Sequence, residues 1–169
     1  LPILEHAGII GAGAGSTLSE ACSPRTVQRG DVKASFISID TTWKPFGATD
    51  TEPGTCHVDI TDPESALSLL GPHIETARRQ SDVLLIAMHW GKNQKSRPTN
   101  AARKLAKALI NAGADGILGS SAHVLQGVEL IEGRPVIYDM GNLLFDNHAS
   151  GEMLRGGLFT LGLDHTGIR

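Results

Sequence analysis

The sequence predicts an α/β fold in which helices flank a mixed β-sheet. Residues 83–88 form a continuous apolar run of strand length, typical of a strand buried on both faces of a sheet. Residues 99–112 repeat apolar side chains along one helical face. Strand and helix patterns alternate through the middle of the chain, whereas hairpin patterns dominate its end. That combination favours a mixed sheet.

The first forty residues predict two short helical segments and two strands. The end of a helix is expected to run into a short strand at residues 8–10. Thr17, followed three residues later by Glu20, has the spacing of a capping box and predicts a helix that begins near Thr17. Residues 33–40 combine alternation with β-branched side chains and predict a strand.

A long connection and a second helix follow. Residues 41–61 hold no regular pattern, and a loop of this length tends to be functional or mobile. Thr61 with Glu64 repeats the capping-box spacing and predicts a helix that continues to about Arg79. Gly71-Pro72 is expected to break or kink that helix, because proline lacks the amide hydrogen that a helix interior uses.

The last third of the chain predicts one helix followed by short strands. Gly113 is a credible cap at the end of the helix at residues 99–112. The strands expected after it cover residues 117–118, 128–131, 135–140 and 158–163.

Size and composition describe an ordinary globular chain. Its 169 residues are 40% hydrophobic and 20% charged, which fits a single domain, or a partial domain, over residues 1–169. A net charge of −3 provides no basic surface for nucleic acid. No apolar run has the length of a membrane span. Because the sequence starts with neither methionine nor a secretion signal, we expect a processed or cut piece of a larger protein.

The two cysteines, Cys22 and Cys56, lie far apart in the sequence. Such a pair builds neither a metal knuckle nor a disulfide framework. We predict two unpaired thiols rather than one disulfide, and cysteine usage leaves the cellular compartment open.

The strongest functional signal is a pair of histidines, each at the end of an expected strand. His89 closes the apolar run, and His123 follows a turn of small residues after the next strand. In open α/β sheets, ligands gather at the carboxyl ends of the strands. The two imidazoles therefore predict a shared substrate or a shared divalent metal ion, with manganese, zinc or iron as candidates. The alternative for each is a core histidine bonded to the backbone.

Four further side chains are candidates for substrate binding. Trp90 adjoins His89, and Gln126 lies three residues after His123. Asn142 follows a glycine at a strand end, and Arg97 has the fork that clamps a carboxylate or phosphate. The alternatives are turn chemistry for the two amides and a solvated surface charge for Arg97.

Two weaker motifs suggest other chemistry. Residues 11–15 are rich in glycine but lack both the lysine of a Walker loop and the spacing of a dinucleotide fingerprint, so they favour a tight turn. Ser120 or Ser121 with His123 resembles part of a serine hydrolase site, but no nucleophile elbow and no clear third member accompany them.

Residues 82–146 resemble the CapA family of capsule and poly-γ-glutamate synthesis proteins, which have a calcineurin-like metallophosphatase fold. The matching stretches keep the family's order and spacing: M-H-W-G (88–91), R-P (97–98), A-L-I-N-A-G-A-D (108–115), A-H-V-L-Q-G (122–127), V-E-L-I-E-G-R-P-V-I-Y-D-M-G-N (128–142) and F-D (145–146). A weaker likeness reaches the start of the chain. The resemblance implies the C-terminal half of an α/β/β/α sandwich.

The chain departs from that family in two respects. Family members begin well upstream, with acidic segments and an Asn-Asn-His motif that supply much of a metal cluster, and this chain contains none of them. Relatives usually also have a histidine at Ser120 or Ser121, in a G-H-x-x-H pattern. His89 and His123 are the matching histidines that remain.

The resemblance implies a metal-dependent enzyme that acts on a peptide or a poly-γ-glutamate-like polymer. His89 and His123 would be its catalytic and metal-binding residues, and the metal would activate water or polarise a carbonyl. One alternative is a metal-dependent peptide epimerase of a natural-product pathway, with His123 as the base. Another is a non-catalytic accessory subunit that binds the polymer.

Partners and location follow from the same resemblance. An absent N-terminal half would leave an exposed sheet edge and an exposed apolar face, so we expect association with that half or with a second copy of the chain. Capsule relatives face outward from the membrane, whereas a natural-product enzyme would be cytoplasmic.

Overall fold

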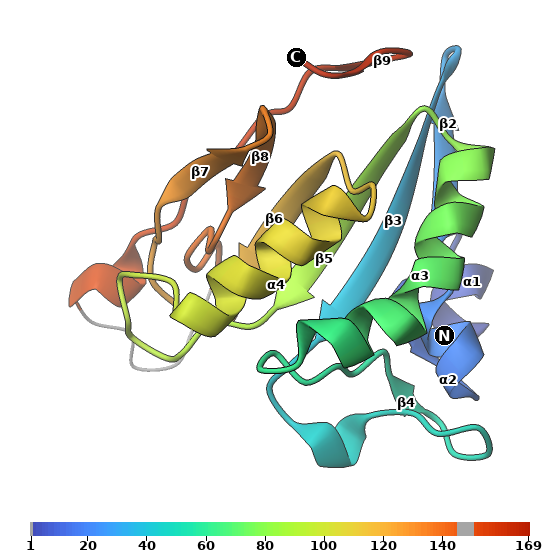
Figure 1. Cartoon of the computed structure of the whole chain (residues 1–169), viewed down its shortest axis with the longest axis horizontal. Helices are drawn as coiled ribbons and strands as arrows, with labels where there is room; N and C mark the ends of the chain where they lie inside the picture. Colours follow the sequence, from blue (N-terminus) through green and yellow to red (C-terminus); the bar gives the residue numbers. More distant parts are fainter. Residues whose placement is uncertain (1, 145–150) are drawn as a thin grey trace.

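Four parallel strands form the centre of a six-stranded mixed sheet (Figure 1). The computed structural model describes residues 2–144 and 151–169. The strand order is β2-β3-β5-β6-β8-β7, and the outer strands β2 and β7 pair antiparallel with β3 and β8. The strands are β2 (Arg25–Arg29), β3 (Val32–Asp40), β5 (Val83–His89), β6 (Gly116–Ser120), β7 (Val128–Ile131) and β8 (Arg134–Ile137).

Short elements surround this sheet. Two further two-stranded ladders join β1 (Ala14–Gly15) to β4 (Gly54–Thr55), and β9 (Leu163–Asp164) to β10 (Gly167–Ile168). The helices are α1 (Pro2–His6), α2 (Leu18–Cys22), α3 (Pro63–Gln80) and α4 (Asn100–Asn111), with single 3-10 turns η1 (Lys44–Phe46) and η2 (Gly151–Leu154). The α/β class and the mixed sheet flanked by helices are confirmed.

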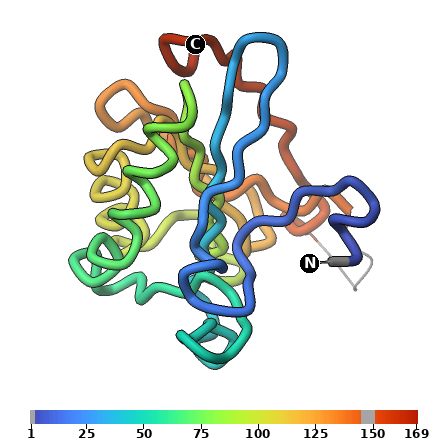
Figure 2. Tube along the Cα trace, turned by 90° about the vertical axis from the view of Figure 1, so that its right-hand side faces the viewer, coloured from blue at the N-terminus to red at the C-terminus, as the bar shows by residue number. Residues whose placement is uncertain are grey.

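Helices α3 and α4 cover one face of the sheet, as Figure 2 shows from the side. Ile37, Ile86 and Ile117 project from neighbouring strands into the main hydrophobic core, where they join Leu70 of α3 and Leu105 of α4. All five side chains are fully buried. The continuous apolar run at residues 83–88 is buried on both faces, apart from a half-buried Ala87.

Helix α3 runs through Gly71-Pro72 without a break, so a break there is wrong, but the helix axis changes direction between its two halves, as a kink requires (Figure 1). Four buried residues of α3 lie on one face both before and after the proline: Ala66, Leu70, Ile74 and Ala77. Packing of this continuous face outweighs the cost of about 3 kcal/mol that an interior proline imposes. The helix cap also differs, since the Asp62 carboxylate, rather than Thr61, accepts from the Ser65 amide. At α2 the expected cap is confirmed, with Thr17 Oγ1 accepting from the Glu20 amide.

Two expected strands do not form. Residues 8–10 lie outside any strand, and of residues 158–163 only Leu163 belongs to one. Ile9, Ile10 and Leu158 are exposed, so the apolar pattern there does not correspond to a buried sheet surface. The expected strand at 135–140 is shorter and shifted, since β8 ends at Ile137.

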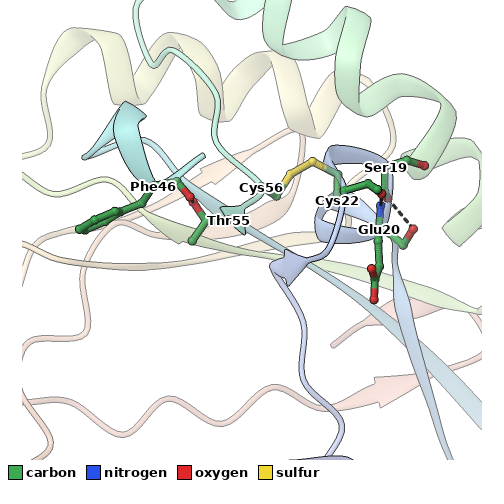
Figure 3. The surroundings of a disulfide bond; sticks show 8 residues. Ser19, Glu20, Cys22, Phe46, Thr55 and Cys56 are labelled. Carbon is green, nitrogen blue, oxygen red and sulfur yellow. Dashed lines mark hydrogen bonds between the residues drawn. A yellow bond between two sulfur atoms is a disulfide. The ribbon is translucent and has the colours of Figure 1, made fainter. Parts of the chain in front are cut away.

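A buried disulfide joins Cys22 to Cys56, so the prediction of two free thiols is wrong (Figure 3). Both residues are 0% exposed. The β1–β4 ladder draws the two chain segments together, and the Cys56 amide donates to the Gly13 carbonyl. The two cysteines are 34 positions apart in the sequence. Their proximity is created by the tertiary fold, which sequence spacing cannot reveal.

Apolar side chains remain exposed on the edge strand β7 and beyond it. Val128 and Leu130 of β7 are 55% and 69% exposed, and Leu154 of η2 is 71% exposed. These features fit the expected exposed edge, while the identity of a partner stays a prediction. Within the described ranges, none of the helices combines the length and the apolar character that crossing a membrane requires.

Candidate functional site

Three polar residues form one row across the carboxyl ends of the parallel strands. In the register of the sheet Asp40 of β3 lies opposite His89 of β5, and His89 lies opposite Ser120 of β6. Side chains alternate between the two faces of a strand, so all three lie on the face opposite Ile37, Ile86 and Ile117. The side chains of the row therefore lie on the sheet face opposite the one that α3 and α4 cover.

Asp40 connects two histidines. Its Oδ1 lies 3.0 Å from His89 Nδ1, and its Oδ2 lies 3.2 Å from His57 Nδ1. The Thr42 hydroxyl also donates to Oδ1, at 2.7 Å. An ionised carboxylate only accepts hydrogen bonds, so both Nδ1 atoms carry the proton and each neutral imidazole has its lone pair on Nε2. The His89 side chain is 52% exposed, which leaves this imidazole accessible to a ligand.

The environment keeps Asp40 ionised. Burial raises the pKa of this carboxyl, but hydrogen bonds from Thr42, His89 and His57 outweigh burial and hold the pKa well below its usual range. The side chain is 13% exposed. A fixed, buried anion between two Nδ1–H groups orients both rings.

His123 belongs to a separate cluster. Its Nδ1 lies 2.9 Å from Asn142 Oδ1, and the Asn142 amide nitrogen donates to the Met153 carbonyl. That second bond identifies Oδ1 as the acceptor, so His123 donates from Nδ1. Ser121 and His123 both have positive φ angles, 99° and 60°. The turn that carries them is held in this sparsely populated conformation by its contacts.

Buried Asp139 is the main anchor of that turn. Its Oδ2 accepts from the Ala122 amide at 2.6 Å, and its Oδ1 accepts from the Gly141 amide at 2.9 Å. Ser121 Oγ donates to the Gly91 carbonyl and Ser120 Oγ donates to the Met88 carbonyl. Both hydroxyls are thereby engaged with the main chain. A serine hydrolase site also needs a carboxylate beside its histidine, and the Asp40 carboxylate bonds His89, in the other cluster.

The other predicted site residues have different surroundings. Trp90 is 4% exposed, stacks on Tyr138 and donates from Nε1 to the Tyr138 carbonyl, which leaves little of its indole for a substrate. Gln126 is 9% exposed and its Nε2 donates to the Lys95 carbonyl at 2.8 Å. Arg97 lies exposed in the connection between β5 and α4. Asp146, the last residue of the stretches that resemble the CapA family, lies outside the described residues.

The described part of the chain supplies imidazoles suited to a metal but not a complete ligand set. In residues 2–144 and 151–169 no group of three or more His, Cys, Asp or Glu side chains could hold a metal ion. Asp40 uses both oxygens on histidines, and His89 and His123 bond to different partners. Their Nδ1–H tautomers are nevertheless those of metal-binding histidines with a supporting acceptor. A metal centre here would need ligands from outside the described residues.

Asp40 and His57 were not predicted as site residues. Asp40 ends the strand at residues 33–40, so the strand-end rule that selected His89 applied to it equally. His57 carries no such signal, because residues 41–61 have no pattern. It reaches Asp40 through backbone pairing: the Asp40 amide donates to the Cys56 carbonyl, and the Val58 amide donates to the Asp40 carbonyl.

Asp40→Asn is expected to lower the free energy of unfolding near neutral pH by about 1–3 kcal/mol, since it weakens hydrogen bonds to a charged group. The folded-state pKa of Asp40 is depressed, so its stabilisation is fully present above the ordinary carboxyl pKa of about 4 and is lost as the pH falls below it. Urea unfolding at several pH values would measure this. The difference between wild type and variant should shrink in acid, whereas Asp50→Asn, in an exposed loop, should have little effect at any pH.

Relatives of this chain act in capsule and polymer synthesis. The chain is 34% identical over 136 residues to a PGA biosynthesis protein CapA of Bacillus subtilis, and the aligned region covers 79% of this chain and 34% of that protein. It is 30% identical over 99 residues to a capsule biosynthesis protein CapA of Bacillus anthracis, with coverage of 59% and 23%. A probable polyglutamine synthesis accessory protein of Mycobacterium tuberculosis is 26% identical over 156 residues, with coverage of 88% and 40%.

The chain thus spans between about a quarter and two fifths of the length of these relatives. The family model described as the bacterial capsule synthesis protein PGA_cap matches residues 1–147. That match covers most of the chain and includes every strand-end residue described above. By this match and its CapA relatives, the chain belongs to the family of bacterial capsule synthesis proteins PGA_cap.

Proposed function

We propose that this chain forms part of a protein of capsule or poly-γ-glutamate synthesis, and that the strand-end row acts on the polymer. The names of the relatives support the process. The Asp40–His89 hydrogen bond is the observation that carries the site. It is the contact that turns an exposed imidazole at a sheet edge into an oriented one.

His89 is the residue that we assign to the polymer. Asp40 holds its Nδ1, so the Nε2 lone pair accepts a proton from an amide, a water molecule or a carbon acid that lies over the row. The buried carboxylate also stabilises the imidazolium that results. His57 bonds the second oxygen of Asp40 and keeps that carboxylate from rotating away.

A divalent metal is compatible with the tautomers of two residues of this chain. His89 and His123 are the imidazoles that we propose to hold it through Nε2, together with ligands outside the described residues. In that metal-bound form the Nε2 lone pair of His89 would serve as a ligand instead of as the base. When bound, the metal would polarise a carbonyl or acidify water. Asn142 would then position His123, because its Oδ1 fixes the ring through Nδ1.

A polymer-binding accessory role is the second candidate. The name of the Mycobacterium relative favours it. Ser120 or Ser121 stands where the family resemblance implies a histidine, and this also favours it, since both hydroxyls bond main-chain carbonyls.

The test incubates the 169-residue chain with poly-γ-glutamate, with and without Mn²⁺ or Zn²⁺. Polymer length is followed by size-exclusion chromatography, glutamate chirality by chiral chromatography, and bound metal by elemental mass spectrometry. We expect wild type to change the length or the chirality of the polymer, and the rate of that change to be at least about tenfold lower in His89→Ala. The His89→Ala, His123→Ala double variant should lose bound metal.

His165→Ala is the matched control, since His165 also bonds an aspartate, Asp82, but just before the start of β5. It should behave like wild type. Polymer binding without any change in length or chirality would favour the accessory role. Absence of both binding and change would contradict the proposed function.

A further inference from the structure

A cavity of about 400 Å³ opens beside the Asp40–His57 pair. Thr41, Thr42 and His57, which come from the end of β3 and the connection after it, form the side nearest the row. Lys44 and Asp59 line the same cavity, and Ser65 and Leu69 enter it from α3. We call it the Lys44–Asp59 cavity. The residues that orient His89 thus also form a wall of a binding space.

The Lys44 side chain and the Asp59 carboxylate bring opposite charges to the cavity. Asp59 accepts from the Thr61 hydroxyl at 2.6 Å and from the Thr61 amide at 2.8 Å. These hydrogen bonds lower the pKa of Asp59, and the nearby charges of His57 and Lys44 lower it further. The carboxylate therefore stays ionised at neutral pH and faces the same space as the Lys44 ammonium.

An apolar surface lies beside the charged groups. Val58 and Ala66 line the cavity and are 4% and 2% exposed, and Leu69 packs partly buried against the core. Such a surface suits short methylene chains. A ligand that matches the whole cavity combines an ammonium, a carboxylate and a few methylene groups.

We propose that the Lys44–Asp59 cavity binds the free α-amino acid end of a glutamate unit. Lys44 would bind the α-carboxylate, Asp59 would bind the α-ammonium, and the two side-chain methylenes would lie against Leu69. The choice of glutamate rests on the proposed function. In a γ-linked chain the first residue keeps its ammonium and carboxylate on one carbon, whereas inner residues keep only the carboxylate. The cavity would therefore recognise the amino terminus of the polymer.

The experiment titrates the full 169-residue chain with a γ-linked glutamate pentamer and with its N-acetylated form, by calorimetry or by NMR. We expect acetylation to weaken binding at least about tenfold, because it removes the ammonium that pairs with Asp59. Lys44→Met and Asp59→Asn should each weaken binding of the free pentamer to a similar extent. Both side chains are exposed, so the variants are expected to keep the fold, which circular dichroism would verify.

Two substitutions in the β2–β3 hairpin serve as controls. Lys33→Met and Asp31→Asn remove the same charges at the far end of β3 and should leave the affinity within about twofold of wild type. Equal affinity for the two pentamers, or equal affinity of the cavity variants and the controls, would overturn the inference. Since the readout is binding rather than turnover, that failure would leave a His89-dependent change in the polymer intact.

Discussion

Trp90→Ala is expected to lower the free energy of unfolding by about 3–5 kcal/mol, the range for a large aromatic side chain lost from a packed core. The indole is 4% exposed and stacks on Tyr138 with 5.6 Å between ring centroids. Its Nε1 also donates to the Tyr138 carbonyl at 2.9 Å, across from β5 to the end of β8. Truncation would open a void beside the Tyr138 ring and leave the Tyr138 carbonyl without the hydrogen bond from Nε1.

Urea unfolding followed by circular dichroism measures this effect. Trp90→Phe should retain part of the stacking and lose the donor, and should therefore fall between wild type and Trp90→Ala. Trp43→Ala is the matched control, because Trp43 is 58% exposed and its ring lies beside that of Phe46, with 6.4 Å between centroids. A loss below about 1 kcal/mol for Trp90→Ala would show that the indole is not a core element and would restore its candidacy for substrate binding.

Trp90 also shows why a local pattern misassigns roles. From the sequence it is the neighbour of a strand-end histidine, and aromatic residues in such places commonly contact ligands. In the fold, Gly119 of β6 determines where the indole goes. A β-carbon at Gly119 would collide with the Tyr138 carbonyl and with Trp90 Nε1, so this glycine provides the room for the indole. That three-residue contact joins segments far apart in the chain, and no periodicity encodes it.

The central strands and helices were predictable because their burial is regular. Residues 83–88 are a continuous apolar run and residues 99–112 repeat apolar side chains along one face. Both bury these side chains in the same core, and the pattern alone identifies them. The segments at 8–10 and 158–163 have apolar residues without a sheet neighbour, and the same pattern there predicts strands that do not form. Pattern reports the preference of a segment, whereas a strand also needs a partner.

The candidate site was predictable to a similar extent. His89 was correctly placed at a strand end, and its neighbour in register, Asp40, would have followed from the same rule. The sequence could not show that His89 and His123 would bond to different partners. His89 bonds a carboxylate on β3, whereas His123 bonds an amide in a turn anchored by Asp139. His123 also has a positive φ angle, which a sequence pattern does not predict for a histidine.

Removal of the Cys22–Cys56 disulfide, by Cys22→Ser with Cys56→Ser, is expected to cost about 3–4 kcal/mol of stability. The bond closes a loop of 34 residues, and the entropy that the unfolded chain regains grows with that length. The figure applies to urea unfolding of the double variant against the oxidised protein. A reducing agent should cause the same loss of stability only when urea has opened the fold, because both cysteines are fully buried in the folded chain.

The same bond is expected to act on the candidate site through Cys56. The Cys56 carbonyl and the Val58 amide both bond the backbone of Asp40, and His57 lies between them. If the disulfide holds this segment against β3, Asp40→Asn should cost less in the disulfide-free background than in wild type, a coupling that a double-mutant cycle measures. Additive costs would show instead that the backbone bonds alone position His57. Disulfides persist in oxidising surroundings, so we also expect the bond to form when the chain is produced under oxidising conditions and to be largely absent after synthesis in a reducing cytosol. In that reduced form the free energy of unfolding should be lower by the same amount, about 3–4 kcal/mol, so the chain should unfold at a lower urea concentration. A loss of that size is a large share of the roughly 5–15 kcal/mol that stabilises a typical domain.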